Sequence, residues 1–259
     1  EVPSRWDFVK QTPLCTKIVN KFGVSVSTIE HILAALAGCG VHNANIEIDN
    51  LEVPILDGSA RPFAMEILRI GIVNLEAPLS IMRIKNDVSF SLGKGWAKLE
   101  ASNEPRMTFS IKFQDAAIGF QKKSISLSNG SFVKNLCDSR TFCSVDNVEA
   151  MRAEGLALGG SLDNAVVFDG ESVLNPGGLR HKDEAVRHKM LDAIGDLSLI
   201  GQPLICHYIG NCAGHAITNG LIRKLFASPE SYEIINCQDK VYKILPGVGA
   251  TLAELPLVA

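Results

Sequence analysis

The stretch Asp183–Leu199, DEAVRHKMLDAIGDLSL, carries the strongest helix pattern in this sequence of 259 residues. Its first residue is of a type that caps helices, and Gly201 and Pro203 follow as stop signals, so we predict a helix at 184–199. Four apolar side chains share one face, at Val186, Met190, Ile194 and Leu197. A helix with one apolar face has to pack on another layer of structure, which the rest of the sequence must supply.

The segments around this helix form runs of strands and runs of helices. Leu79–Ile125 mostly alternates polar and apolar residues with turn residues between, which predicts strands that include 81–88, 96–99 and 107–113. Further helices are predicted at 28–38, 60–70, 146–153 and 215–227, and further strands at 45–49 and 165–168. Because strands and helices come in separate runs, the pattern indicates α+β layers and not a doubly wound sheet. We place a domain boundary near residue 78.

Composition and charge limit the class of protein. Apolar residues make up 46% and charged residues 20% of the sequence, with a net charge of −3, which is typical of a packed domain and excludes disorder. No run of five like charges and no apolar stretch of about 18 residues occurs, so we expect no nucleic-acid partner and no membrane span. The seven cysteines contain no C-x-x-C pair, which favours free thiols in a reducing compartment.

Polar residues share the other face of the helix at 184–199. At about 100° per residue, His188, Asp192 and Asp196 lie within about 80° of one another. A histidine and a carboxylate four residues apart can bind one ion, and imidazole with carboxylate suits zinc. A solvent-exposed helix face is the alternative interpretation, and this spacing alone leaves both open.

Two other histidines stand at predicted helix starts. Glu30 follows Ser27 at the spacing of a capping box, so it either caps the helix or acts on a water bound to a metal at His31. His215 follows Gly214 and would serve as an acid if a carboxylate held it. No serine-hydrolase elbow, Walker A or H-E-x-x-H motif is present.

Six stretches together resemble one known family. They are STIEHILAAL (27–36), EVPILDGSA (52–60), RTF (140–142), GGS (159–161), VRHKMLDAIGDL (186–197) and GHA (214–216), in order along nearly the whole chain. They are similar to the UDP-3-O-acyl-N-acetylglucosamine deacetylases, zinc amidases of lipid A synthesis. The resemblance implies hydrolysis of an N-acetyl group on an acylated UDP-sugar. It also implies two β-α-α-β sandwich domains, at 1–78 and 79–259, with helices packed between the sheets.

The resemblance implies roles for individual residues as well. One zinc ion per chain would bind His31, His188 and Asp192. The proton carriers would be Glu30, as general base on the zinc-bound water, and His215, as general acid oriented by Asp196. Thr141 and Lys189 would assist the oxyanion and the substrate. The passage for the acyl chain and its neighbouring turn would include Phe142, Val148, Gly160, Ser161 and Val167.

Two departures from the family bear on these expectations. Family members usually begin earlier, with paired strands and a Gly-Leu-His-x-Gly segment, so we expect a first domain that is truncated at its N-terminus and a chain that has been processed or trimmed. Cys212 stands where the family commonly has a basic residue, which leaves Lys189 or Arg140 to contact the diphosphate.

The alternative from another class is a truncated, non-catalytic relative that holds a metal or binds a nucleotide sugar. Glu30 and His215 favour catalysis, because a binding module has little need of both. A structural zinc site is disfavoured, since such sites usually close with four protein ligands. The location would be the cytoplasm of a bacterium or, for a plant source, an organelle matrix such as that of mitochondria. The oligomeric state is left open.

Overall fold

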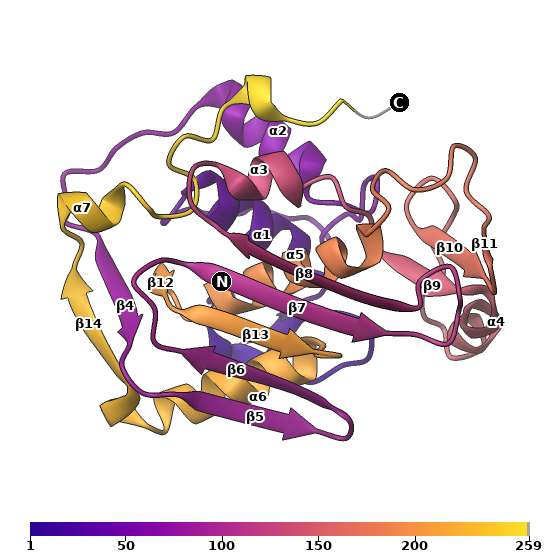
Figure 1. Cartoon of the computed structure of the whole chain (residues 1–259), viewed down its shortest axis with the longest axis horizontal. Helices are drawn as coiled ribbons and strands as arrows, with labels where there is room; N and C mark the ends of the chain where they lie inside the picture. Colours follow the sequence, from indigo (N-terminus) through magenta and orange to yellow (C-terminus); the bar gives the residue numbers. More distant parts are fainter. Residues whose placement is uncertain (258–259) are drawn as a thin grey trace.

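A five-stranded sheet forms one layer of the computed structural model, which describes residues 1–257 (Figure 1). Its strands, in order across the sheet, are β5 (Val88–Leu92), β6 (Gly95–Glu100), β13 (His207–Asn211), β7 (Arg106–Lys112) and β8 (Phe120–Ser126). Neighbours are antiparallel except β13 and β7, which run parallel. Alternate residues of β6 and β7 are buried, among them Leu99 and Phe109, so one face of this sheet belongs to the core.

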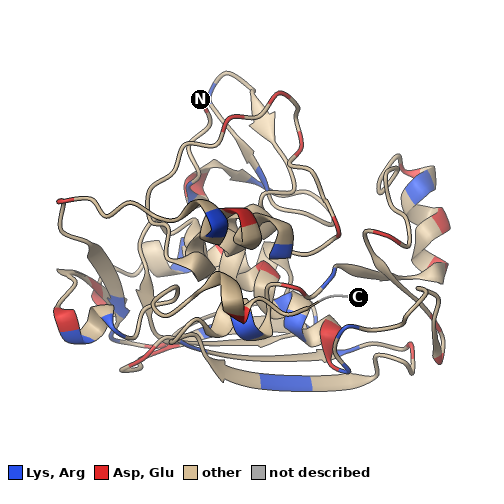
Figure 2. Cartoon of the chain, turned by 90° about the horizontal axis from the view of Figure 1, so that it is seen from above, with Lys and Arg blue, Asp and Glu red and all other residues tan. Residues whose placement is uncertain are grey.

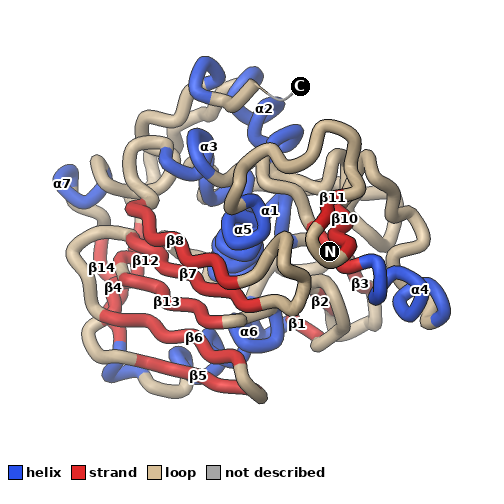
Figure 3. Tube along the Cα trace, turned by 45° about the vertical axis from the view of Figure 1, so that its right-hand side comes forward, coloured by secondary structure: helices blue, strands red, loops and turns tan. Residues whose placement is uncertain are grey.

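Two long helices lie on this sheet (Figure 3). α5 (Glu184–Ser198) packs on β7 and β8, and α6 (His215–Phe226) packs on β5 and β6. α1 (Glu30–Cys39) packs on α5, and α2 (Arg61–Ile70) packs on α1. In the view of Figure 2 the large sheet is the lower layer and the helices lie above it, with Lys and Arg interspersed among Asp and Glu.

Small sheets and short helices complete the fold among residues 1–257. The sheets are β1 (Val9–Lys10), β2 (Lys17–Val19) and β3 (Ser25–Val26); β12 (Leu204–Ile205), β4 (Ser80–Ile84) and β14 (Tyr232–Asn236); and β11 (Ser172–Val173), β10 (Val166–Asp169) and β9 (Phe142–Ser144). The helices are α3 (Ser131–Asn135), α4 (Val145–Ala153), α7 (Asp239–Tyr242), and the 3-10 helices η1 (Trp6–Phe8), η2 (Pro229–Ser231) and η3 (Leu252–Glu254). The β9–β11 sheet and α4 project together from one side of the molecule (Figure 1). None of the described helices has the length and hydropathy needed to cross a membrane.

The largest buried apolar cluster draws on both halves of the chain. Ala34 of α1 and Ala64 of α2 belong to it together with Met82, Phe109 and Leu191. Burial of each large side chain in such a cluster contributes about 1.5–3 kcal/mol. The core is thus continuous across residue 78, and the division into domains at that point stays a prediction.

The α+β class is confirmed, and most predicted helices are found close to their expected ends. The helices expected at 60–70, 146–153, 184–199 and 215–227 correspond to α2, α4, α5 and α6. The strand expected at 165–168 is β10, and the alternating segment Leu79–Ile125 forms β4 to β8. These elements are recovered because their periodicity is local and their stop signals are glycines or prolines.

Other expectations were wrong. Residues 45–49 form no strand, because no described strand pairs with them and the alternating pattern has no sheet to join. The strand expected at 81–88 is two strands, β4 and β5, separated by a turn. The first helix begins at Glu30 instead of residue 28, and the short helix α3 was not expected at all.

Gly195 lets α1 approach α5 closely. A Cβ atom at this position would lie 2.0 Å from the backbone carbonyl oxygen of Glu30. That oxygen belongs to the first residue of α1, so it moves only if the start of the helix moves. Because Gly195 has no side chain, the start of α1, with Glu30 and His31, can lie against the polar face of α5.

We expect Gly195→Ala to destabilise the protein by about 1–3 kcal/mol, the usual range for an overpacked contact. The urea unfolding midpoint measures this loss. Gly159→Ala is the control, because nothing lies within 4 Å of a Cβ at Gly159. Equal midpoints for the two variants would contradict the close approach of the helices.

Candidate metal centre and active site

Three side chains from α1 and α5 converge in the interior. The ligand atoms of His31, His188 and Asp192 all lie within 4.8 Å of one another. The Asp192 Oδ1 atom is 3.2 Å from Nε2 of His188 and 3.7 Å from Nε2 of His31. All three residues are at most 5% exposed. The alternative interpretation of a solvent-exposed helix face is therefore wrong, because α1 covers this face of α5.

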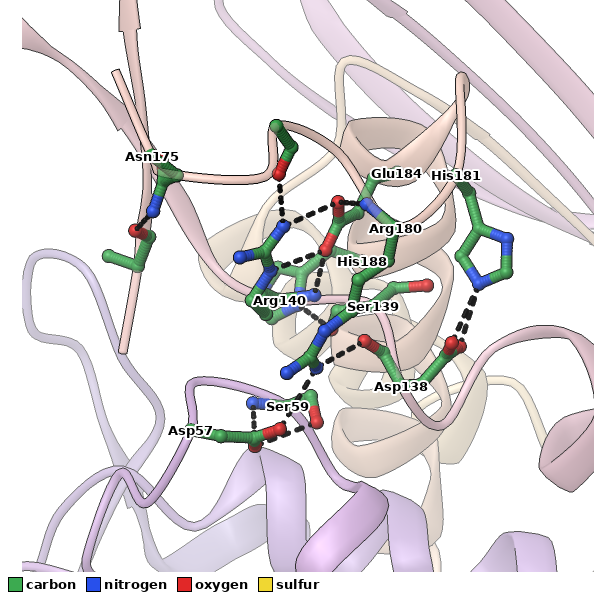
Figure 4. A network of polar contacts seen from close by, with 12 residues as sticks. Asp57, Ser59, Asp138, Ser139, Arg140, Asn175, Arg180, His181, Glu184 and His188 are labelled. Carbon is green, nitrogen blue, oxygen red and sulfur yellow. Dashed lines mark hydrogen bonds and ion pairs between the residues drawn. The ribbon is translucent and has the colours of Figure 1, made fainter. Parts of the chain in front are cut away.

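Both imidazoles can present a lone pair to a metal ion. Nδ1 of His188 lies 3.0 Å from the Ser139 carbonyl oxygen, which can only accept, so this nitrogen donates and the ring turns Nε2 toward Asp192 (Figure 4). Burial, and the charge that His188 would carry, lower the pKa of His31 to about 3. The buried Nδ1 atom of His31 has no hydrogen-bond partner among the described residues. Two imidazoles beside a carboxylate are a donor set that suits zinc.

The two oxygens of Asp192 have different partners. Oδ1 faces the imidazoles, and Oδ2 accepts a hydrogen bond of 2.6 Å from Nζ of Lys189. Burial alone would raise the pKa of Asp192, but His188 and Lys189 outweigh it and hold this pKa well below its usual range. Burial likewise opposes the charge on Lys189, and Asp192 outweighs it, so that the pKa of Lys189 is raised. Asp192 is therefore an ionised candidate ligand whose orientation Lys189 fixes.

Glu30 does not form the capping box that its spacing suggested. The residue before it, Ile29, is the N-cap of α1, and no side chain caps the helix there. Instead Oε2 of Glu30 accepts the backbone N–H of Thr16 at 3.0 Å. Burial raises the pKa of Glu30 to about 7, with Asp192 and Asp196 adding to the rise and His215 opposing it. A carboxyl group with this pKa can exchange a proton at neutral pH, as a general base must.

His215 and Asp196 form a buried pair. Nδ1 of His215, at the start of α6, lies 2.8 Å from Oδ2 of Asp196 on α5. Burial lowers the pKa of His215, but the negative charge of Asp196 and its hydrogen bond outweigh it and raise this pKa to about 10. The imidazole is therefore protonated at neutral pH and able to donate a proton.

Phe142 lies beside the candidate ligand His188, and Thr141 directly precedes Phe142 in the chain. The N–H of Thr141 donates to the Gly58 carbonyl at 2.7 Å, and its own carbonyl accepts from Val166 at 2.8 Å. These bonds hold the start of β9 in place. The Phe142 ring lies edge-on to His188, with the ring centres 6.2 Å apart.

Apolar residues continue from Phe142 away from the metal centre. Phe168 and Phe113 stack edge-on against its ring, with centres 6.0 and 5.4 Å away. Val167 is half-buried beside β9, and Val148 is half-buried on α4, which packs on β9 and β10. In the register of β9 and β10, Val166 pairs with Phe142 and Val167 pairs with Cys143, so Val167 lies on the opposite face of this sheet from Phe142. Gly160 and Ser161 lie nearby in an exposed turn.

Comparison with known proteins identifies the family of this chain. The model of the LpxC family, UDP-3-O-acyl N-acetylglycosamine deacetylase, matches residues 1–227. The chain belongs to this family. The chain is similar to proteins named UDP-3-O-acyl-N-acetylglucosamine deacetylase. The protein of that name from Pasteurella multocida is 43% identical over 240 residues, which cover 92% of this chain and 79% of the relative. The one from Shewanella violacea is 40% identical over 237 residues, covering 91% of this chain and 78% of the relative.

Membership of the LpxC family confirms the resemblance seen in the sequence and implies a metal-dependent deacetylase. Within this site, sequence analysis missed Thr16, Ser139 and Glu184. Thr16 contributes through its backbone N–H and its hydroxyl, and Ser139 contributes through its backbone carbonyl. A backbone contact cannot be predicted from the identity of a residue. Glu184 lies in the first turn of α5, where a carboxylate is common because it interacts favourably with the helix dipole.

Glu184 organises a polar network around Arg140 in this LpxC-family site (Figure 4). Its carboxylate accepts Nε and Nη2 of Arg140 at 2.9 and 3.1 Å, and the backbone N–H of Arg140 at 3.0 Å. It also accepts the backbone N–H of Arg180 at 2.7 Å. Arg140 is paired with Glu184 and Lys189 with Asp192, so neither side chain is free to contact a diphosphate in this structure.

Proposed function

We propose that this chain hydrolyses the N-acetyl group of UDP-3-O-acyl-N-acetylglucosamine at one zinc ion per chain, releasing acetate and UDP-3-O-acyl-glucosamine in lipid A synthesis. The observation that carries the proposal is one buried cluster with separate groups for each task. His31, His188 and Asp192 converge as ligands, Glu30 is poised to accept a proton, and His215 is poised to donate one. The names of the relatives give the same substrate and reaction.

The donor set supports zinc as the metal. Two imidazole nitrogens and one carboxylate oxygen are the ligand types of catalytic zinc sites, which keep a further position open. When bound, zinc supplies a Lewis acid that polarises the amide carbonyl and lowers the pKa of a water molecule. Lys189 and the Ser139 carbonyl hold Asp192 and His188 in the orientation that such a site needs.

The proton transfers belong to residues of this chain. Thr16 holds Oε2 of Glu30, which leaves Oε1 to accept a proton from the attacking water. Asp196 holds Nδ1 of His215, which leaves Nε2 to donate a proton to the departing amine nitrogen. The Thr141 hydroxyl and the Lys189 ammonium group would stabilise charge on the carbonyl oxygen, and one such donor is worth roughly 2.7–4 kcal/mol.

Acetate release by the purified, zinc-loaded chain tests the proposed function. The substrate is UDP-3-O-acyl-N-acetylglucosamine, and the control is the same protein after removal of zinc with a chelator. Binding of zinc and of the UDP-sugar without acetate release would support the non-catalytic alternative. A bacterial cytoplasmic or plant organellar location stays a prediction.

We expect kcat/KM to fall as the acyl chain of the substrate is shortened, by about 0.8 kcal/mol for each buried CH₂ lost. The reason is the apolar group that Phe142 forms with Phe113 and Phe168, against which an acyl chain would be buried. Kinetics with a series of acyl lengths measure the slope. Phe142→Ala should make this slope shallower. Equal rates with and without the acyl chain would contradict the proposed acyl passage.

A further inference from the structure

Thr16 lies between the two proton-transfer groups. It is 3% exposed and directly precedes β2, outside all six stretches that carry the family resemblance. Glu30 is at the start of α1, and Asp196 is near the end of α5. Thr16 therefore lies just outside the first small sheet and contacts a residue of each helix.

Each polar group of Thr16 has a partner at this site. Its backbone N–H donates to Oε2 of Glu30 at 3.0 Å, and its hydroxyl donates to Oδ1 of Asp196 at 2.5 Å. Its carbonyl accepts the N–H of Ile29, the residue before Glu30, at 3.4 Å. The main chain of Thr16 thus holds the base, and its side chain holds the carboxylate that orients the acid.

The hydroxyl contact matters because Asp196 is buried. Oδ2 of Asp196 binds Nδ1 of His215, so Thr16 supplies the partner of the other oxygen. A carboxylate fixed at both oxygens cannot rotate, and the imidazole that it holds keeps one orientation. Without the hydroxyl, Oδ1 would lose this donor and the carboxylate would gain freedom to turn away from His215.

We propose that Thr16 is a positioning residue that holds the Glu30 carboxylate and the Asp196–His215 pair in register for successive proton transfers. The three contacts of Thr16 support the geometry of this proposal. Its effect on the reaction rate rests on the proposed function. Thr16 does not touch the reacting atoms. It acts through Glu30 and Asp196.

Two substitutions isolate the hydroxyl. Thr16→Val keeps the shape and the backbone N–H to Glu30 and removes the bond to Asp196, whereas Thr16→Ser keeps that bond. We expect Thr16→Val to lower kcat by about 10- to 100-fold with little change in KM or zinc content, since misplacement of a catalytic group costs up to about 100-fold. Thr16→Ser should retain kcat within a few-fold. Thr218→Val is the matched control, because the hydroxyl of this buried threonine bonds Tyr208 and Gly214 and no carboxylate.

Coupling to Asp196 gives the sharper test. In an Asp196→Asn background, Thr16→Val should lower kcat little further, because both substitutions disturb the same unit. Additive losses, or an unchanged kcat in Thr16→Val, would overturn the proposal. So would equal losses of zinc and Tm in the Val and Ser variants, which would indicate a merely structural role.

A readout without turnover separates this proposal from the proposed function. The NMR resonance of the His215 Nδ1 proton, recorded on the zinc-loaded protein without substrate, should shift or broaden in Thr16→Val and return in Thr16→Ser. If the wild-type chain releases no acetate but the resonance responds in this way, the proposed function fails and the positioning role stands. An unmoved resonance in Thr16→Val overturns the positioning role, whatever the rate of the wild-type chain.

Discussion

His188→Ala should lose zinc and turnover together. The substitution removes one of three ligand atoms that lie within 4.8 Å of one another and leaves His31 and Asp192 without the third donor. The metal is worth several kcal/mol of transition-state stabilisation, so kcat/KM should fall by about 10³-fold or more. Elemental analysis of the purified variant gives the zinc content, and acetate release gives the rate.

His207→Ala is the matched control for this experiment. His207 lies on β13 of the large sheet, where Nε2 contacts the Thr108 hydroxyl, and it has no part in the metal centre. We expect this variant to keep its zinc and its rate. Full zinc occupancy in the His188→Ala protein would show that the ion binds elsewhere.

The sequence grouped the candidate metal ligands better than it predicted their surroundings. Asp192 follows His188 by one helical turn, so local periodicity alone placed both on one face of α5. Whether that face was exposed to solvent or buried depended on α1, which lies about 150 residues earlier in the chain and packs on α5. Gly195 was the available signal, because a glycine within a polar helix face is typical of a close backbone approach.

Local patterns were misleading where a tertiary contact replaced a local one. Glu30 has the spacing of a capping-box carboxylate, yet it bonds Thr16, fourteen positions earlier, and helix α1 begins without a side-chain cap. Residues 45–49 have the alternation of a strand, but a strand also needs a partner, and periodicity carries no information on pairing. The Ser139 carbonyl that orients His188 was beyond prediction, since every residue has such a group.

The pH dependence of kcat/KM should separate the two proton-transfer residues. Glu30 must be ionised to accept a proton, so activity rises with pH through its pKa, which burial raises to about 7. A divalent cation beside this carboxylate would favour its charged form, so we expect the acid limb at or below that value. His215 must be protonated to donate, and Asp196 overcomes the effect of burial to raise its pKa to about 10, so activity falls as pH rises through that region.

Two variants assign the limbs to their residues. Glu30→Gln keeps the size of the side chain and its contact with the Thr16 N–H, so it should retain zinc and lose about 10²- to 10⁴-fold in rate, the usual contribution of a general base. His215→Ala should also retain zinc, because His215 is not in the ligand group, and it should lose the alkaline limb. A His215→Ala protein with near-normal rate and an unchanged alkaline limb would assign that limb to another group. Glu30 would then have to serve as both base and acid, and the Asp196–His215 pair would be left to bind the substrate.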